Sequence, residues 1–149
     1  MAQSQEQILV VVSDGQVSFL LDRVLKSMGY DVQAISDQAS ALKSLDKHIP
    51  ALVVVGEKLN DISGLDFAAD LLRRNPSMPI ILFVQHDSPE VLKSAMRLGI
   101  NEYLTMPLRT EDVTRAVKGT LELAKLRRDA TILESRRATQ NLQRRLDEL

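Results

Sequence analysis

The stretch Ile8-Leu9-Val10-Val11-Val12 contains five apolar residues in a row, most of them β-branched. Such an unbroken run predicts a strand that is buried on both faces, as strands of parallel sheets are. Apolar residues at helical spacing follow over 17–28, and strand and helix patterns then continue to alternate. The predicted strands are 8–12, 32–35, 52–55, 80–84 and 102–104, and the predicted helices are 17–28, 39–45, 65–72, 91–98 and one that begins near 113. Repeated strand–helix units predict an α/β fold, a doubly wound parallel sheet covered by helices on both faces.

Short polar signals mark the starts of these helices. Ser13-x-x-Gln16 and Ser63-x-x-Asp66 predict capping boxes, in which the serine oxygen accepts a hydrogen bond from a backbone N–H of the first turn. Ser88, directly before a proline, predicts a third N-cap. These signals support the predicted order of elements independently of the hydrophobic pattern.

The composition is that of a single globular domain. The chain has 149 residues, of which 44% are hydrophobic and 26% charged, and its net charge is -1. So small a net charge gives no general attraction to nucleic acid or to anionic membranes. The absence of cysteine excludes disulfides and thiolate metal sites and fits a reducing compartment, so we expect a cytoplasmic protein. No apolar run approaches the ~20 residues of a membrane-spanning helix, and residues 1–7 lack the apolar centre of a signal peptide.

The last stretch, 127–149, differs from the rest of the chain, and we expect it to extend the fifth helix without a break. It contains no glycine or proline, and residues with high helix propensity dominate it. We therefore divide the chain into a domain over 1–126 and a helical extension over 127–149. Two interpretations remain for the extension, a solvated helix or a helix that dimerises or transmits a signal, and the poor stability of a lone helix favours the second. Its apolar positions fall into two a/d phases, one with Leu123, Leu126, Ala130 and Leu133 and one with Leu142, Leu146 and Leu149, and the change lies near Arg136 and Arg137.

Short landmarks flank the predicted strands and helices. They are the opening 8–11, Met28-Gly29-Tyr30, Pro50-Ala51-Leu52-Val53, Gly64-Leu65-Asp66, Pro79-Ile80-Ile81 and the stretch 98–107. Over about residues 7–125, their joint spacing resembles the receiver domain of bacterial two-component response regulators. The resemblance implies a flavodoxin-like (βα)5 fold with strand order 2-1-3-4-5. It also implies a cis peptide bond between Met106 and Pro107.

The resemblance places function at the carboxyl ends of the strands, near the switch between the first and third strands. In receiver domains, two acidic residues after the first strand and an aspartate after the third bind Mg²⁺, and that aspartate accepts a phosphoryl group. A threonine or serine after the fourth strand and a lysine after the fifth bind the phosphoryl oxygens. The corresponding positions here are Val12 and Ser13 for the two acids, Gly56 for the aspartate, Val84 for the hydroxyl residue and Met106 for the lysine.

None of these five positions keeps the group that the family's chemistry needs. Mg²⁺ prefers hard oxygen ligands, whereas Val12 and Gly56 have no side-chain oxygen. We interpret the hydroxyl of Ser13 as the N-cap of the first helix. Phosphoryl transfer also needs a nucleophile and positive charge, which Gly56 and Met106 lack. The sequence therefore predicts a degenerate receiver with no bound metal, no cofactor and no enzymatic activity.

Three nearby acids remain as candidates for a displaced phosphoacceptor. Asp14 is explained by an N-cap or first-turn place in the first helix, and Asp61 by the loop after the third strand, where acids favour turns. Glu57 directly follows the position of the lost aspartate, so its side chain should project differently. We expect none of the three to accept a phosphoryl group. His48 and His86 are the only histidines and lack the spacing of a metal site.

The resemblance also implies a contact face formed by the fourth helix, the fifth strand and the fifth helix. Its mixed charges suit a protein partner and suit a solvated surface about as well. Tyr103 on this face corresponds to an aromatic residue that changes position during receiver signalling, and it is equally explained as a half-buried aromatic of a strand. The charged residues of the face are Lys93, Arg97, Glu102, Arg115 and Lys118.

Four arginine pairs, at 73–74, 127–128, 136–137 and 144–145, raise the question of nucleic-acid binding. Acids are interleaved with the pairs of the tail and only 3% of residues are aromatic, so we expect no nucleic-acid partner.

The main hypothesis is a phosphorylation-independent protein-interaction module of two-component or phosphorelay signalling. It would form a homodimer through its C-terminal helix and contact a protein partner or an output domain. The alternatives are a phosphorylatable regulator that uses a displaced acid, and a flavodoxin-like small-molecule binder or enzyme that shares only the scaffold.

Overall fold

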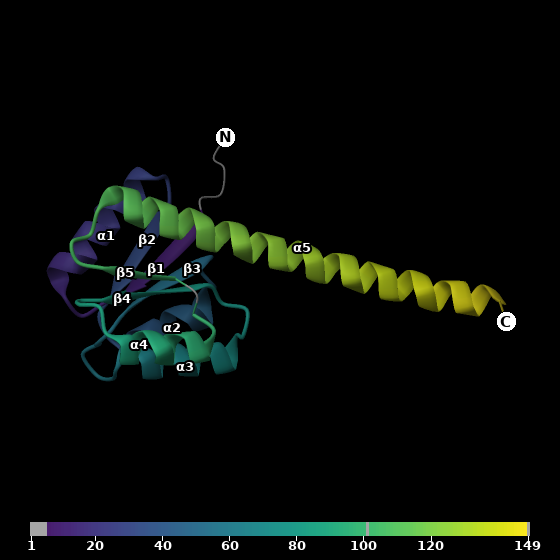
Figure 1. Ribbon diagram of the computed structural model, residues 1–149, viewed down its shortest axis with the longest axis horizontal. Coiled ribbons are helices and arrows are strands. Elements are labelled where there is room, and N and C mark those ends of the chain that lie inside the picture. Colours follow the sequence, from purple (N-terminus) through teal and green to yellow (C-terminus); the bar gives the residue numbers. More distant parts are fainter. Residues whose placement is uncertain (1–5, 101, 149) are drawn as a thin grey trace.

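The computed structural model describes residues 6–100 and 102–148, in which five strands alternate with five helices (Figure 1). The strands are β1 (Gln7–Val11), β2 (Asp31–Ile35), β3 (Leu52–Gly56), β4 (Ile80–Val84) and β5 (Glu102–Thr105). The helices are α1 (Gly15–Ser27), α2 (Gln38–Lys47), α3 (Gly64–Arg74), α4 (Pro89–Leu98) and α5 (Thr110–Glu148). Each element predicted from the sequence is present in the predicted order, with ends that differ by only a few residues.

The five strands form one parallel sheet in the order β2-β1-β3-β4-β5, which confirms the flavodoxin-like topology. β1 lies between β2 and β3, so the direction of winding switches beside it. Gly56 at the end of β3 lies opposite Phe83, and Val84 at the end of β4 lies opposite Thr105. The carboxyl ends of β1, β3, β4 and β5 are therefore neighbours along one edge of the sheet.

Helices cover both faces of this sheet (Figure 1). α1 and α5 cover one face, where Val10 and Val117 belong to the same buried core. α2, α3 and α4 cover the other face, where Val53 and Phe67 belong to a second core. Successive residues of a strand point to opposite faces, so a strand covered on both sides must be apolar throughout. This explains the unbroken apolar runs of the sequence.

The predicted helix caps are confirmed at two sites and wrong at a third. Ser63 Oγ accepts a hydrogen bond from the backbone N–H of Asp66 at 3.1 Å, and the corresponding bond to Ser88 Oγ measures 3.4 Å. The N-cap predicted at Ser13 is wrong, because α1 begins at Gly15 and its cap is the residue before. The cis peptide bond expected between Met106 and Pro107 is present.

α5 runs without interruption for 39 residues, as the sequence predicted. Its first part packs on the sheet through Val113, Ala116 and Val117. The helix then leaves the domain and projects away from it (Figure 1), and its residues 125–148 are all exposed. Within the two described ranges, no helix has the length and apolarity that crossing a membrane requires.

Candidate functional site

The positions that correspond to the receiver phosphorylation site lie at the carboxyl edge of the sheet. Val12 follows β1, Gly56 ends β3 and Val84 ends β4, and these strands are neighbours. A Cβ atom placed on Gly56 would lie 3.4 Å from the Cα and Cγ1 atoms of Val12. Met106 directly follows Thr105, the residue that pairs with Val84. The fold thus brings together the positions that the resemblance assigned to a receiver site.

The interior of this edge is apolar. Val12 is 4% exposed and Val84 is fully buried, Gly56 is buried without a side chain, and Met106 is 40% exposed at the rim. Burying a phosphoryl group or Mg²⁺ here would remove its hydration without a compensating partner. Because Val12 and Gly56 offer no side-chain oxygen, the residues present do not fit the Mg²⁺ that receiver domains bind. Among the residues that the structure describes, no group of three or more His, Asp or Glu is placed to hold a metal ion.

Ser13 and Asp14, in the loop after β1, are both engaged in hydrogen bonds. The Ser13 hydroxyl donates to the carbonyl oxygen of Lys58 at 2.8 Å and so joins this loop to the loop after β3. This contact explains why the hydroxyl does not cap α1. Asp14 is the cap, since its carboxylate accepts hydrogen bonds from the backbone N–H groups of Gln16 at 2.9 Å and Val17 at 3.2 Å. The Asp14 carboxylate therefore has the structural role that its place in the sequence suggested.

Asp61, in the loop after β3, stabilises the start of α2. Its carboxylate oxygens accept hydrogen bonds from the backbone N–H groups of Gln38 at 2.8 Å and Ala39 at 3.2 Å. Hydrogen bonding from Gln38 is the main reason why the pKa of Asp61 lies below its ordinary value, because the bond stabilises the charged form. The backbone N–H of Asn60 also donates to the carbonyl of Ser36 at 3.1 Å. The loop 57–63 is thus held against the beginning of α2.

The same loop closes tightly at Gly64. The backbone N–H of Gly64 donates to the carbonyl of Glu57 at 2.8 Å, and Lys58 and Ser63 form a β-bridge across the loop. A Cβ atom at Gly64 would overlap the carbonyl oxygen of Gly56, so only glycine fits this close approach. The hydrophobic pattern of the sequence gave no sign of this contact. The side chain of Glu57 is partly buried beside it.

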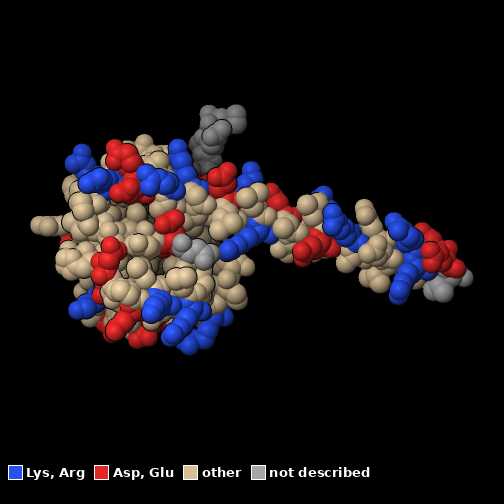
Figure 2. Space-filling view, viewed as in Figure 1, with Lys and Arg blue, Asp and Glu red and all other residues tan. Residues whose placement is uncertain are grey.

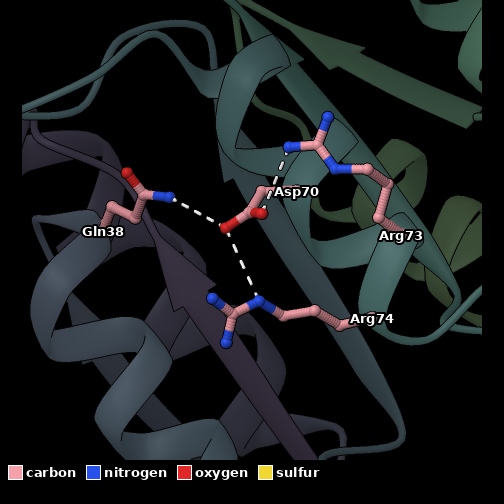
Figure 3. A network of polar contacts seen from close by, with 4 residues as sticks. All are labelled: Gln38, Asp70, Arg73 and Arg74. Atoms are coloured by element: carbon pink, nitrogen blue, oxygen red, sulfur yellow. Dashed lines mark hydrogen bonds and ion pairs between the residues drawn. The ribbon is translucent and has the colours of Figure 1, made fainter.

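A separate set of polar contacts joins α2 to α3 (Figure 3). The carboxylate of Asp70 accepts a hydrogen bond from Gln38 Nε2 at 3.2 Å and forms ion pairs with Arg73 at 3.2 Å and Arg74 at 3.6 Å. The arginine side chains are 74% and 55% exposed, so each pair contributes less than about 1 kcal/mol. Together with Asp61, Asp70 holds α2 in place below the carboxyl edge.

The residues predicted for a contact face lie on three elements, α4, β5 and α5. Tyr103 is 42% exposed and Met96 is 72% exposed, so apolar surface is present among the charges. Arg115 forms an exposed ion pair with Asp112 at 3.7 Å. Figure 2 shows positive and negative side chains interspersed over the visible face of the domain and along the helix. The predicted residues are Lys93 and Arg97 on α4, Glu102 and Tyr103 on β5, and Arg115 and Lys118 on α5.

Curated relatives of the chain include transcriptional regulatory proteins. It is 28% identical over 121 residues to the alkaline phosphatase synthesis transcriptional regulatory protein PhoP of Bacillus subtilis, which covers 81% of this chain and 50% of PhoP. It is 27% identical over 114 residues to the probable transcriptional regulatory protein TcrX of Mycobacterium tuberculosis, which covers 76% of this chain and 49% of TcrX. The chain thus spans about half the length of these curated relatives.

Solved structures show the same fold. NtrX from Brucella abortus superposes with a TM-score of 0.84 at 25% identity, over 89% of this chain and 31% of NtrX. A CheY-like response regulator receiver domain protein from Methanospirillum hungatei superposes with a TM-score of 0.77 at 21% identity, over 83% of this chain and 99% of that one. The profile of the response regulator receiver domain family matches residues 8–118. The chain therefore belongs to the response regulator receiver domain family, whose members are signalling modules of two-component systems.

Proposed function

We propose that this receiver domain acts as a phosphorylation-independent protein-interaction module in two-component signalling. The observation that carries the proposal is the apolar packing of Val12 beside Gly56, where the family places carboxylates. A phosphoryl group at this edge would have no acceptor and no oxygen ligands for Mg²⁺. The side chains of Val84 and Met106 would also give its oxygens no hydrogen-bond donor. On this proposal the chain works by binding, without catalysis and without a cofactor.

The acids around the edge favour this function over phosphorylation at a displaced residue. The carboxylates of Asp14 and Asp61 already accept backbone hydrogen bonds at the starts of α1 and α2. Phosphorylating either carboxylate would remove a helix cap, which is unfavourable. Glu57 lies beside the tight turn at Gly64, in a loop fixed by backbone hydrogen bonds. None of the three lies in a group of oxygen ligands suited to Mg²⁺ among the described residues.

We propose that a protein partner docks on the face of α4, β5 and α5, and that the chain forms a homodimer through α5. Exposed Met96 and Tyr103 within a surface of mixed charge suit a protein better than a nucleic acid. Along the extension 127–149, Leu142 and Leu146 are 65% and 63% exposed, and a helix partner would remove them from water. The match covers only about half of each relative named as a transcriptional regulator, so an output domain joined to α5 is part of the proposal.

The test is incubation with acetyl phosphate and Mg²⁺, followed by intact-mass measurement. We expect no phosphorylated species from this chain. The matched control restores the family's groups in the same chain through Val12→Asp, Ser13→Asp, Gly56→Asp, Val84→Thr and Met106→Lys. A phosphorylated species from the control shows that the assay works. A phosphorylated species from the unaltered chain, mapping to Asp14, Glu57 or Asp61, would overturn the proposal.

A further inference from the structure

α5 carries an almost uncharged stripe on its inner side, the side that packs on the domain. Upstream, Val113 and Val117 bury this side against the sheet. Residues three or four positions apart lie on the same face of a helix, and such steps lead from Val117 through Leu121 and Ala124 into the free part of α5. There the inner stripe consists of Arg128, Ile132, Ser135, Thr139, Leu142 and Leu146, with one charged residue among them.

This geometry explains why the apolar residues in the last part of α5 fall into two a/d phases. Leu142 and Leu146 continue the inner stripe, whereas Leu126 and Leu133 lie on the outer side of α5. A heptad repeat assumes 3.5 residues per turn, but a straight α-helix has 3.6, so a straight stripe drifts out of heptad phase. The change of phase near Arg136 therefore reflects two separate rows of apolar residues. One row runs straight along the inner side of α5, and a shorter row lies on its outer side.

The inner side of α5 lines a groove of about 820 Å³ where the helix leaves the domain. Ala124 and Ile132 lie on the helix wall of the groove, and Ile49, Pro50 and Met78 lie on the domain wall, in the loops before β3 and β4. Ile49 is 68% exposed and Ile132 is 50% exposed. Apolar side chains on both walls are therefore open to water, at the place where the inner stripe leaves the domain.

We propose that the inner stripe pairs antiparallel with the inner stripe of a second copy of this chain, so that the end of each α5 lies at the groove of the other copy. The inference rests on the homodimer proposed above and specifies its interface. In this register Ile132 lies opposite Leu142 of the second copy, and Ser135 lies opposite Thr139 near the two-fold axis. Small side chains at the centre let the helices approach closely, and larger apolar side chains close each end.

The antiparallel orientation follows from the direction in which the stripe faces. The domain packs on the inner side of α5 (Figure 1), so the first half of a parallel partner helix would run through the volume of the sheet. An antiparallel partner approaches from the free end, and its own domain lies beyond that end. A parallel pair would also set Arg128 against Arg128, whereas the antiparallel register sets it against Leu146, at the level of Asp147 of the second copy.

The order of side chains along the stripe favours a second copy as the partner. The small hydroxyl residues Ser135 and Thr139 lie two positions before and after Arg137. The large apolar residues Ile132 and Leu142 lie five positions before and after it. An isologous interface requires this kind of self-complementarity. The ends also match in charge, because the turn with Arg127 and Arg128 lies level with the acidic pair 147–148 of the second copy.

Engineered cysteines test the orientation, and the chain has no cysteine of its own to interfere. Under mild oxidation we expect an equimolar mixture of Ile132→Cys and Leu142→Cys to form a disulfide between the two variants, identified by peptide mapping. Each variant alone should not form one, because like positions lie about 15 Å apart along the antiparallel pair. The matched control uses Leu126→Cys and Leu133→Cys on the outer side, which should form no disulfide.

Light scattering of the unaltered chain separates the possible outcomes. A dimer in which Ile132→Cys or Leu142→Cys alone becomes linked indicates parallel pairing and overturns this inference, while the homodimer stands. A dimer that forms no disulfide between positions 132 and 142 also overturns this inference, while the homodimer stands. A monomer at all concentrations overturns both this inference and the proposed homodimer.

As a second test, Leu142→Glu should weaken the dimer about 30-fold or more, and Leu133→Glu should leave it unchanged. The reverse result would move the interface to the outer side.

Discussion

At the carboxyl edge of the sheet, Val12 and Val84 are buried. Ser13, Asp14 and Asp61 around them are hydrogen-bonded. Along α5 beyond Ala124 the opposite holds, since apolar side chains are exposed on the part of the helix that projects from the domain (Figure 1). The first region is where the receiver family carries out its chemistry, and here it is packed and closed. The second exposes apolar surface, and it is the region where we propose that a partner binds. The comparison fits the function that we propose, which depends on association rather than on phosphoryl chemistry.

The hydrogen bonds at the carboxyl edge make the contrast sharper. Ser13 joins the loop after β1 to the loop after β3, and Asp61 joins that second loop to α2. Switching by a bound phosphoryl group requires that the group interact differently with two conformations. Here hydrogen bonds between protein groups already join the neighbouring loops to one another and to α2.

The largest effect should come from placing a charge in the closed edge. We expect Val12→Asp alone to lower the free energy of unfolding by about 4 kcal/mol at neutral pH, because it buries a carboxylate without a partner. Chemical denaturation measures the change. The control, Gln16→Asp, adds the same charge to the exposed first turn of α1 and should have almost no effect. A tolerated Val12→Asp would mean that the edge is more polar than the packing indicates.

The next effect should come from the tight turn beside Gly56. We expect Gly64→Ala to lower the free energy of unfolding by about 3 kcal/mol, because the new methyl group overlaps a backbone carbonyl that cannot easily move. Gly119→Ala is the matched control on α5, where nothing lies near the added methyl group, and it should raise the free energy of unfolding by about 0.5–1 kcal/mol. Equal effects at the two glycines would remove the distinction between a closed and an open region.

Removing residues 127–149 should separate the two regions altogether. At a dilution where the full chain is monomeric, we expect the free energy of unfolding to change by less than about 0.5 kcal/mol, because none of the residues 127–148 belongs to either buried core. At higher concentration the full chain should be a dimer by light scattering and the shortened chain a monomer. A shortened chain that still dimerises would place the interface on the domain.

The smallest effect concerns the pH dependence of Asp61. Its pKa is lowered by hydrogen bonds to the start of α2, so its contribution to stability is present above the ordinary value of 3.8 and is lost as the pH falls through the lowered folded-state value. We therefore expect Asp61→Asn to destabilise the chain at pH 7 and to make little difference at the acid end of the titration. Denaturation at a series of pH values measures this, and a destabilisation that persists unchanged into acid would contradict it.

Much of the fold could be predicted because its signals are local. The apolar runs, the serines at positions 63 and 88 and the glycine that ends α4 each act within a few residues, where periodicity and capping are decisive. The error at Ser13 has the same local origin. Ser13 and Asp14 are both good capping residues, and only the exact start of α1 decides between them, which hydrophobic spacing does not determine.

The candidate site could be predicted only in part. Strand order and resemblance placed Val12, Gly56 and Val84 at one edge, and the structure brings them together. The role of Asp61 was missed because its partners lie 22 and 23 residues away in the sequence, and the fit of Gly64 against Gly56 because a backbone contact has no signature in the pattern. The inner stripe of α5 was missed because a heptad pattern follows 3.5 residues per turn, whereas the stripe of a straight helix follows 3.6.

The most direct test of the account is the melting temperature of the full chain with and without Mg²⁺ and beryllofluoride, an analogue of a bound phosphoryl group. A ligand that binds only the folded state raises the melting temperature. We predict the same melting temperature in both conditions, because the carboxyl edge offers the analogue neither an acceptor nor a metal ligand, and we predict a rise for the variant with all five receiver groups restored. A rise for the unaltered chain, at the same concentrations, would contradict the claim that this edge no longer handles phosphate.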